Sequence, residues 1–189
     1  MTLFQVIMLG ISAFFAFKVY EHIQTLQDPQ PKKDNHTPSS FDPESLVQRA
    51  DEAFDEGDMQ KALALYSEAN TKVSQDADIL FKIGYILQQS GDNSEAIRYF
   101  KEALEKDNKN EYIHNSIASV YRAEGEFVSA RMHLSASLNI NPDNAVTYYN
   151  YGNLLVDMKH FDEAKEMYKK AIEINPDFSE AKEELAKLA

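Results

Sequence analysis

Few side chains of this 189-residue chain could do chemistry, and they form no catalytic or metal-binding pattern. No two of its histidines stand at the spacing that lets one helical face hold a metal ion. The histidines are His22, His36, His114, His133 and His160. Acids four residues apart, as at Asp51 and Asp55, are typical of the solvated face of a helix in an acidic protein. The pattern therefore predicts neither an acid–base pair nor a metal site.

The composition excludes further classes of function. The sequence has no cysteine, which excludes disulfides, thiolate catalysis and cysteine-based zinc sites. It also has no glycine-rich phosphate loop and no nucleophile elbow. The net charge of -12 argues against nucleic acid or an anionic lipid surface as the main partner. We therefore predict a protein that is not an enzyme and that needs no cofactor.

A 34-residue period organises the chain from Pro43 onwards, as a self-comparison of the sequence shows. Such a period is the signature of stacked-repeat architectures. Small residues recur in three columns, with a turn column and a bulky column between them. The three small columns are Ala50, Gly84, Ala118 and Gly152; Ala62, Ala96, Ala130 and Ala164; and Ala69, Ala103, Ser137 and Ala171. The turn column is Gly57, Gly91, Gly125 and Lys159, and the bulky column is Tyr66, Phe100, Leu134 and Tyr168.

Each column has a physical reason. Two helices that cross closely need small residues where their backbones approach, and bulky residues fill the neighbouring grooves. A glycine ends the first helix at little cost because it accepts positive φ. Pro142 and Pro176 cannot continue a helix, so they separate one pair from the next. The pattern predicts first helices near 43–56, 77–90, 111–124 and 145–158, and second helices near 59–73, 93–107, 127–141 and 161–175.

These columns resemble the tetratricopeptide repeat (TPR) family, whose period and order of small, aromatic and proline positions they share. The resemblance implies an all-α solenoid of about four helix hairpins over 43–189. Its repeats are 43–76, 77–110, 111–144 and 145–178, and a capping helix follows at 179–189. Lys159 departs from the family pattern at a turn glycine, and His114 departs from it at an aromatic position.

The amino-terminal segment 1–28 is predicted to be a transmembrane anchor. From Leu3 to Tyr20 only Gln5, Ser12 and Lys18 are clearly polar, and about 18 residues of helix span about 27 Å. A cleaved signal peptide and a soluble helix are the alternatives, although no basic n-region and no cleavage motif are present. Residues 29–42, with several prolines, are expected to form a flexible polar linker.

The location follows from the lysines after the predicted span. Lys18, Lys32 and Lys33 favour the cytoplasmic side for the repeat domain under the positive-inside rule. We therefore expect a single-pass protein of a bacterial inner membrane with its repeats in the cytoplasm. The periplasmic side is the alternative. The architecture is similar both to bacterial inner-membrane repeat scaffolds and to mitochondrial import receptors.

The resemblance also implies a ligand groove on the concave side, lined by the first helices. Carried over by position, the predicted groove residues are Phe81, Lys82, Tyr85, Tyr112, Asn115, Ser119, Arg122, Tyr149, Asn150 and Asn153. Tyrosines offer apolar area with a hydroxyl, and asparagines can pair with a peptide backbone. Val47 and Asp51 stand where some relatives carry the basic set that captures chaperone tails, so that ligand is disfavoured.

The sequence thus predicts a membrane-anchored adaptor whose groove binds a peptide or helix segment of a partner protein. The alternatives are a periplasmic assembly factor of the same fold, a module that self-associates into a homo-oligomer, and a supporting subunit of an enzyme. Packing of the tyrosines between neighbouring repeats remains an alternative to their role in binding.

Overall fold

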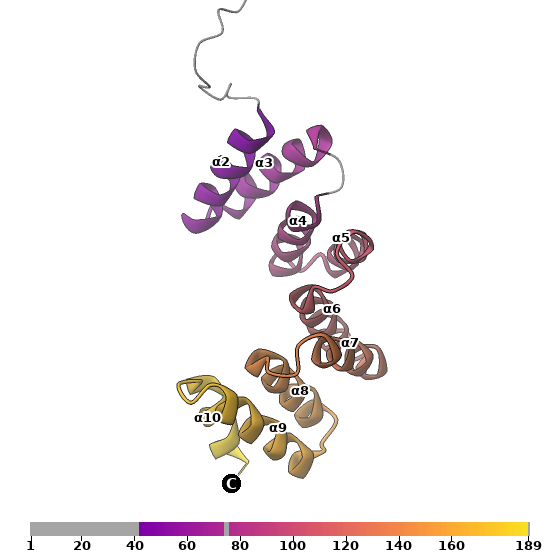
Figure 1. Cartoon of the computed structure of the whole chain (residues 1–189), viewed down its shortest axis with the longest axis vertical. Coiled ribbons are helices and arrows are strands. Elements are labelled where there is room, and N and C mark those ends of the chain that lie inside the picture. Colours follow the sequence, from indigo (N-terminus) through magenta and orange to yellow (C-terminus); the bar gives the residue numbers. More distant parts are fainter. Residues whose placement is uncertain (1–41, 74–75, 189) are drawn as a thin grey trace, which may run out of the picture. The chain divides into compact units, whose positions relative to one another are not determined.

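The computed structural model describes residues 42–73 and 76–188. Within these ranges the chain forms nine helices and no strands (Figure 1). They are α2 (Pro43–Asp55), α3 (Met59–Lys72), α4 (Ala77–Gln89), α5 (Asn93–Lys106), α6 (Glu111–Ala123), α7 (Phe127–Ile140), α8 (Ala145–Asp157), α9 (Phe161–Ile174) and α10 (Ser179–Lys187). The expectation of an all-α stack of helix hairpins is confirmed for this part of the chain.

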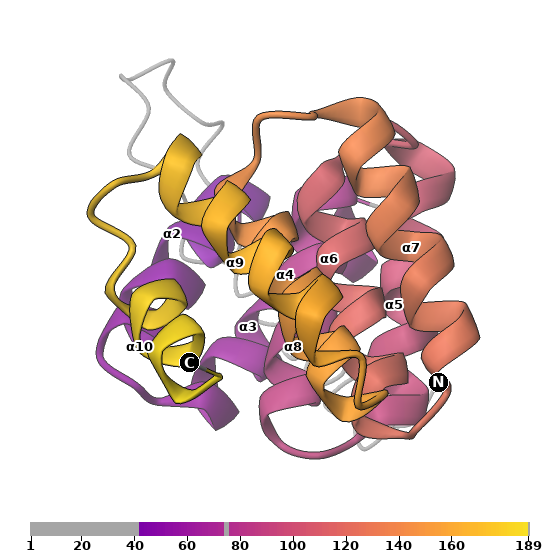
Figure 2. The same ribbon diagram turned by 90° about the horizontal axis from the view of Figure 1, so that it is seen from below.

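Consecutive helices pair into hairpins: α2 with α3, α4 with α5, α6 with α7, and α8 with α9. The second helix of each hairpin also contacts the first helix of the next one, so each hairpin covers its successor. In Figure 2 the second helices α5 and α7 lie at the right-hand side of the repeats, and the first helices α4 and α6 lie nearer the middle. The surface formed by the first helices α2, α4, α6 and α8 is called the first-helix face below.

The local sequence explains where the helices begin and end. The Asp58 carboxylate accepts from the backbone N–H of Lys61 at 3.1 Å, and Asp76 and Asn110 cap α4 and α6 in the same way. Gly57, Gly91 and Gly125 adopt φ between +79° and +83° after the first helices. Lys159 takes the same turn at φ +63°, a left-handed conformation that is costly for a residue with a side chain.

The small columns are the places where the helices of a hairpin meet. Their alanines are fully buried, and Tyr66, Phe100 and Tyr168 are among the largest fully buried side chains. A Cβ added at Gly152 would lie 2.5 Å from Tyr168 Cε1, and one added at Gly84 would lie 2.7 Å from Phe100 Cδ1. Glycine at these two positions therefore lets a large aromatic ring rest on the backbone of the first helix.

The last helix, α10, packs on α9 through Leu185 and Leu188, which join the cluster around Tyr168. Its opposite side carries charged residues, as expected for a capping helix. The predicted anchor at 1–28 and the linker residues 29–41 lie outside the described residues. Among the residues that are described, no helix combines the length and the apolar character needed to cross a bilayer.

Candidate functional site

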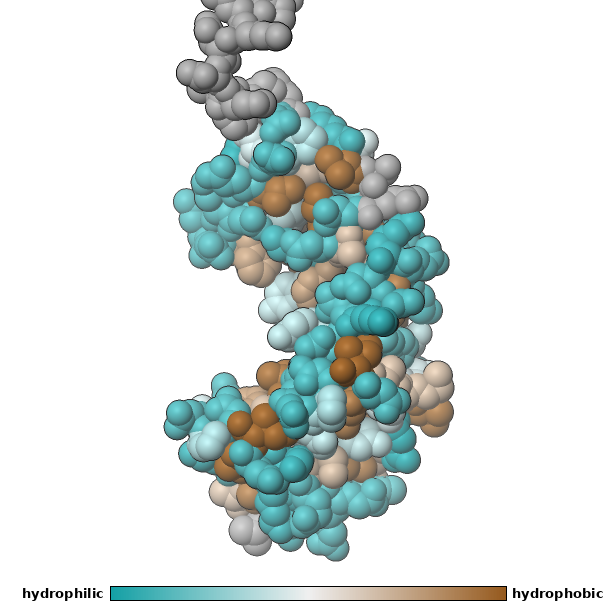
Figure 3. Space-filling model, viewed as in Figure 1, coloured by the Kyte–Doolittle hydropathy of each residue, from teal (hydrophilic) through white to brown (hydrophobic). Residues whose placement is uncertain are grey.

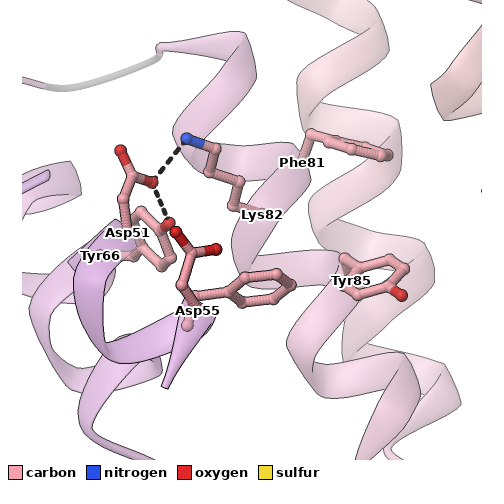
Figure 4. A pocket seen from close by; sticks show the side chains of 7 residues that line it. Asp51, Asp55, Tyr66, Phe81, Lys82 and Tyr85 are labelled. Atoms are coloured by element: carbon pink, nitrogen blue, oxygen red, sulfur yellow. Dashed lines mark hydrogen bonds and ion pairs between the residues drawn. The ribbon is translucent and has the colours of Figure 1, made fainter. Parts of the chain in front are cut away.

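The first two hairpins meet around a cavity of about 600 Å³ between α2 and α4 (Figure 4). Its aromatic part includes Phe54 and Tyr85, whose ring centroids are 5.9 Å apart. Tyr85 is 36% exposed, so its ring is open to a ligand. The lining residues are Asp51, Phe54, Asp55, Tyr66, Phe81, Lys82 and Tyr85. The lining of the cavity therefore combines aromatic area with a few charged side chains, which is typical of ligand sites.

The Asp51 carboxylate binds two other polar groups in the lining of this cavity. Asp51 accepts hydrogen bonds from the Tyr66 hydroxyl and from Lys82 Nζ, the latter at 2.8 Å. Burial opposes ionisation of Asp51, but these two hydrogen bonds outweigh it and lower its pKa. Burial also opposes charging of Lys82, yet its bonds to Asp51 and Asp78 raise its pKa. Both groups are therefore ionised at neutral pH, and they link α2 to α4.

Lys82 is further held by Asp78 at 3.2 Å, one turn earlier on α4. Its ammonium lies 5.5 Å from the centroid of the Tyr66 ring. Burial and the neighbouring Asp51 raise the pKa of the Tyr66 hydroxyl, which therefore stays protonated as a donor. The Lys82 ammonium is thus already bound by Asp51 and Asp78.

Polar bonds also join the later first helices. Gln88 Nε2 donates to Ser119 Oγ at 3.2 Å between α4 and α6. Arg122 Nη1 donates to Asp157 Oδ2 at 2.8 Å between α6 and α8. Asn150 of α8 donates to Asn115 of α6 at 3.2 Å. These bonds span 31 to 35 residues, about one repeat, so each couples neighbouring hairpins on the first-helix face.

Asn115 lies below this surface and is only 6% exposed. Its amide nitrogen is 2.9 Å from Ser137 Oγ and 2.7 Å from Thr147 Oγ1, and both of those residues are fully buried. The same nitrogen lies 3.1 Å from the Glu111 carbonyl oxygen. Asn115 is therefore the centre of a buried polar network that joins α6, α7 and α8, and its amide is occupied within the protein.

The remaining predicted residues lie on α6 and α8. Tyr112 is 59% exposed and free to contact a ligand. The Tyr149 ring lies 5.0 Å from Phe178 and 6.0 Å from Tyr168, so it packs toward the carboxyl-terminal cap. Asn153 accepts a hydrogen bond from the buried Tyr168 hydroxyl at 2.7 Å. Tyr149 and Asn153 are thus engaged in internal contacts, whereas Tyr112 is open.

A model of the tetratricopeptide repeat matches residues 53–120 and 121–188. The chain belongs to the tetratricopeptide repeat family. Its relatives include the tetratricopeptide repeat-containing protein trd-1 of Caenorhabditis elegans, 29% identical over 92 residues (48% of this chain, 12% of that protein). Another is DnaJ homolog subfamily C member 3 of Gallus gallus, 28% identical over 118 residues (62% of this chain, 23% of that protein). The chain thus spans between about an eighth and a quarter of these relatives.

Solved structures share the fold. A crystal structure of MamA superposes with a TM-score of 0.66 at 23% identity, over 77% of this chain and 80% of that one. The first tetratricopeptide repeat domain of Spaghetti (RPAP3), bound to the HSP90 peptide SRMEEVD, gives a TM-score of 0.57 at 26% identity. That match covers 61% of this chain and 91% of that domain.

The structure divides the predicted groove residues of this tetratricopeptide repeat protein into three groups. Phe81, Lys82 and Tyr85 come together at the cavity between α2 and α4. Ser119, Arg122 and Asn150 line a space of only about 10 Å³. The other four are Tyr112, Asn115, Tyr149 and Asn153. The cavity also uses residues outside the predicted set, chiefly Asp55 and Tyr66. Tyr66 stood in the bulky column, and that signal pointed to packing rather than to the cavity.

Two half-buried histidines face each other between α6 and α7 of the third repeat. His114 Nδ1 and His133 Nδ1 are 3.0 Å apart, and Tyr121 stacks on His133 at 5.8 Å. Burial, with smaller contributions from His114 and Lys101, lowers the pKa of His133 to about 4. Burial also lowers the pKa of His114. No group of three metal-ligating side chains occurs within residues 42–73 and 76–188.

Proposed function

We propose that this protein is a non-catalytic scaffold whose first-helix face binds a peptide segment of a partner protein. The observation that carries the proposal is the cavity of about 600 Å³ between α2 and α4, with Phe54, Phe81 and Tyr85 in its lining. Aromatic rings provide large contact area at low cost in conformational entropy, which suits them to anchor a side chain of a partner. The peptide bound to the related RPAP3 domain supports a ligand of this kind.

The rest of the first-helix face would extend the binding site beyond the cavity. Tyr112 is open on α6, and the partly exposed amides of Gln88 and Asn150 lie at the junctions between helices. An extended peptide needs donors and acceptors for its backbone, and amide side chains supply both. We propose the cavity as the anchor site and the predicted groove residues Ser119, Arg122, Asn150 and Asn153 as peripheral contacts.

Site-specific photocrosslinking tests this function. A photoreactive residue placed at Tyr85 in the full chain should trap a partner protein in native membranes. The matched control is Val128 on α7, which is 77% exposed but lies outside the first-helix face. Trapping at both positions, or only at Val128, would contradict the proposal. Trapping of a second copy of this chain at Tyr85 would favour self-association.

We further propose that residues 1–28 anchor the chain in a membrane and that residues 29–42 form the linker to the repeat domain at 43–189. The proposal is supported by the apolar run from Leu3 to Tyr20. Its favoured form places the repeats in the cytoplasm of a bacterial inner membrane, and the alternative places them in the periplasm. A reporter fused after Ala189 and active on only one side distinguishes the two. Release of the full chain by alkaline carbonate would contradict anchoring.

A further inference from the structure

The charges of the first-helix face restrict what it can bind. Lys82 and Arg122 are the two cations among the predicted groove residues. Lys82 is bound by Asp51 at 2.8 Å and by Asp78 at 3.2 Å, and Arg122 is bound by Asp157 at 2.8 Å. An acidic ligand would have to compete with these carboxylates for either cation. The face therefore offers a negatively charged peptide little electrostatic gain.

The cavity between α2 and α4 has an excess of negative charge. Its lining holds one cation, Lys82, and two acids, Asp51 and Asp55. Within the described residues, the Asp55 carboxylate forms no hydrogen bond or ion pair, whereas Asp51 is engaged twice. Asp78 adds another carboxylate beside Lys82. A ligand that brings a positive charge to Asp55 would therefore meet an unused partner.

The aromatic rings of the cavity also favour a positively charged ligand. Phe54 and Tyr85 lie on α2 and α4 at a centroid distance of 5.9 Å, and Figure 4 shows Tyr85 at the side of the cavity away from Asp51 and Lys82. A cation is attracted to the face of an aromatic ring, and a guanidinium group also stacks on it. Lys82 already makes such a contact with Tyr66, so the site has one internal example of this interaction.

We infer, on the basis of the function proposed above, that this cavity binds a basic peptide segment by an arginine side chain. The guanidinium would lie against Tyr85 and pair with the Asp55 carboxylate, while a neighbouring apolar side chain of the peptide contacts Phe54 and Phe81. Arginine fits better than lysine because its planar group can stack on a ring and pair with a carboxylate at the same time. Acidic segments are the excluded class.

Selection from a random peptide library displayed on phage tests the inference, with the full chain in a neutral detergent as bait. We expect the recovered peptides to be enriched in arginine next to an apolar residue. Enrichment in aspartate or glutamate would overturn the inference and leave the proposed peptide-binding function intact. Recovery no greater than that for the same chain carrying Tyr85→Ala would overturn both.

Two variants then test whether the Asp55 carboxylate is the group that pairs with the arginine of the peptide. For the strongest arginine-containing peptide recovered, Asp55→Asn should weaken binding about fivefold, the effect of losing one partly exposed ion pair. Glu105→Gln removes the same charge from the exposed side of α5 and should leave binding unchanged. Equal weakening by both variants would mean that only net charge is sensed. The peptide SRMEEVD serves as the acidic probe, and binding as tight as that of the arginine peptide would contradict the inference.

Discussion

The first two repeats and the last two are built on the same pattern, yet their polar side chains are used differently. Between α2 and α4 the linking pair Asp51–Lys82 lines a cavity of about 600 Å³. Between α6 and α8 the amide of Asn115 and the hydroxyls of Ser137 and Thr147 fill the interior beneath Asn150, and the space at the surface is only about 10 Å³.

The surface of the repeats in the view of Figure 3 is mostly hydrophilic, with hydrophobic residues in small separate groups.

This difference shows how a repeat protein can place a ligand site in one part of a regular stack. A charged pair joins neighbouring first helices in both halves. Beside Asp51–Lys82, aromatic rings line a cavity of about 600 Å³, whereas beside Arg122–Asp157 the space is only about 10 Å³. Where buried amides and hydroxyls join them, each polar group satisfies another and little room is left for a ligand. The amino-terminal half therefore offers the larger site for anchoring a ligand, while the buried network of the carboxyl-terminal half mainly holds the stack together.

The largest expected effect is the loss of the buried network in the carboxyl-terminal half. Asn115→Ala removes the donor to Ser137 and Thr147 and leaves Asn150 without its acceptor. We expect it to lower the free energy of unfolding by about 3 kcal/mol, because buried polar groups lose their partners. Urea unfolding of the full chain in detergent, followed by circular dichroism, measures it.

The matched control for this prediction is Gln88→Ala, which breaks the part-buried bond to Ser119 between α4 and α6. We expect this variant to lose about 0.5 kcal/mol, as is usual for polar bonds near solvent. Equal losses in the two variants would mean that the halves do not differ in how their polar groups are used.

Adding a methyl group where a ring rests on a helix backbone tests whether the helices are packed equally tightly in both halves. Gly152→Ala places a Cβ 2.5 Å from the Tyr168 ring, and Gly84→Ala places one 2.7 Å from Phe100. Overpacking costs about 1–3 kcal/mol, and alanine's helix propensity returns up to about 1 kcal/mol. We expect a net loss of about 1–2 kcal/mol at each site, read as a lower urea midpoint. A gain in stability would show that the Tyr168 and Phe100 rings shift at little cost to accommodate the added methyl group.

Acid should weaken the third repeat before it weakens the first. The pKa of His133 is lowered to about 4, so the unfolded chain, with an ordinary value near 6.5, binds more protons between these values. Stability is therefore present above about pH 6.5 and falls as the pH drops toward 4. We expect a loss of about 1 kcal/mol after allowance for solvent screening of these half-exposed rings. The free energy of opening, obtained from hydrogen exchange across α6 and α7 at each pH, measures this loss.

The amino-terminal half supplies the contrast for that titration. The pKa of Asp51 is lowered, so its bonds to Lys82 and Tyr66 are lost only below its ordinary value of 3.8. The free energy of opening, obtained from hydrogen exchange across α2 and α4, should therefore stay constant between pH 6.5 and 4. His133→Gln should flatten the response of the third repeat, whereas His160→Gln, at an exposed position before α9, should leave it unchanged.

The smallest expected effect concerns the turn after α8. Lys159→Gly should stabilise the chain by about 0.5–1 kcal/mol, because φ +63° is strained for lysine and not for glycine. The reverse change at the matched turn, Gly125→Lys, should destabilise by a similar amount because Gly125 has φ +79°. Thermal unfolding of both variants checks the pair. A loss of stability in Lys159→Gly would mean that the lysine side chain makes compensating contacts.

The sequence by itself determined the repeat, its helices and its buried columns. The expected first helices begin at the observed residues and end one residue later than observed, because Asp and Asn caps and turn glycines act locally. Ala62 and Phe100 were identifiable as core positions for the same reason, since a 34-residue period marks them in register. The anchor at 1–28 remains a prediction from its apolar run.

Only the tertiary structure decided which polar side chains of the first-helix face are available. Asn115 and Lys82 have the same sequence rationale as groove residues, but one is enclosed by α7 and α8 and the other is paired with α2. These partners lie 22 to 32 residues away, and their meeting depends on how side chains of adjacent helices pack. The physical reason is that a period fixes where a side chain stands, while its neighbours across the interface fix whether its hydrogen-bonding groups are already satisfied.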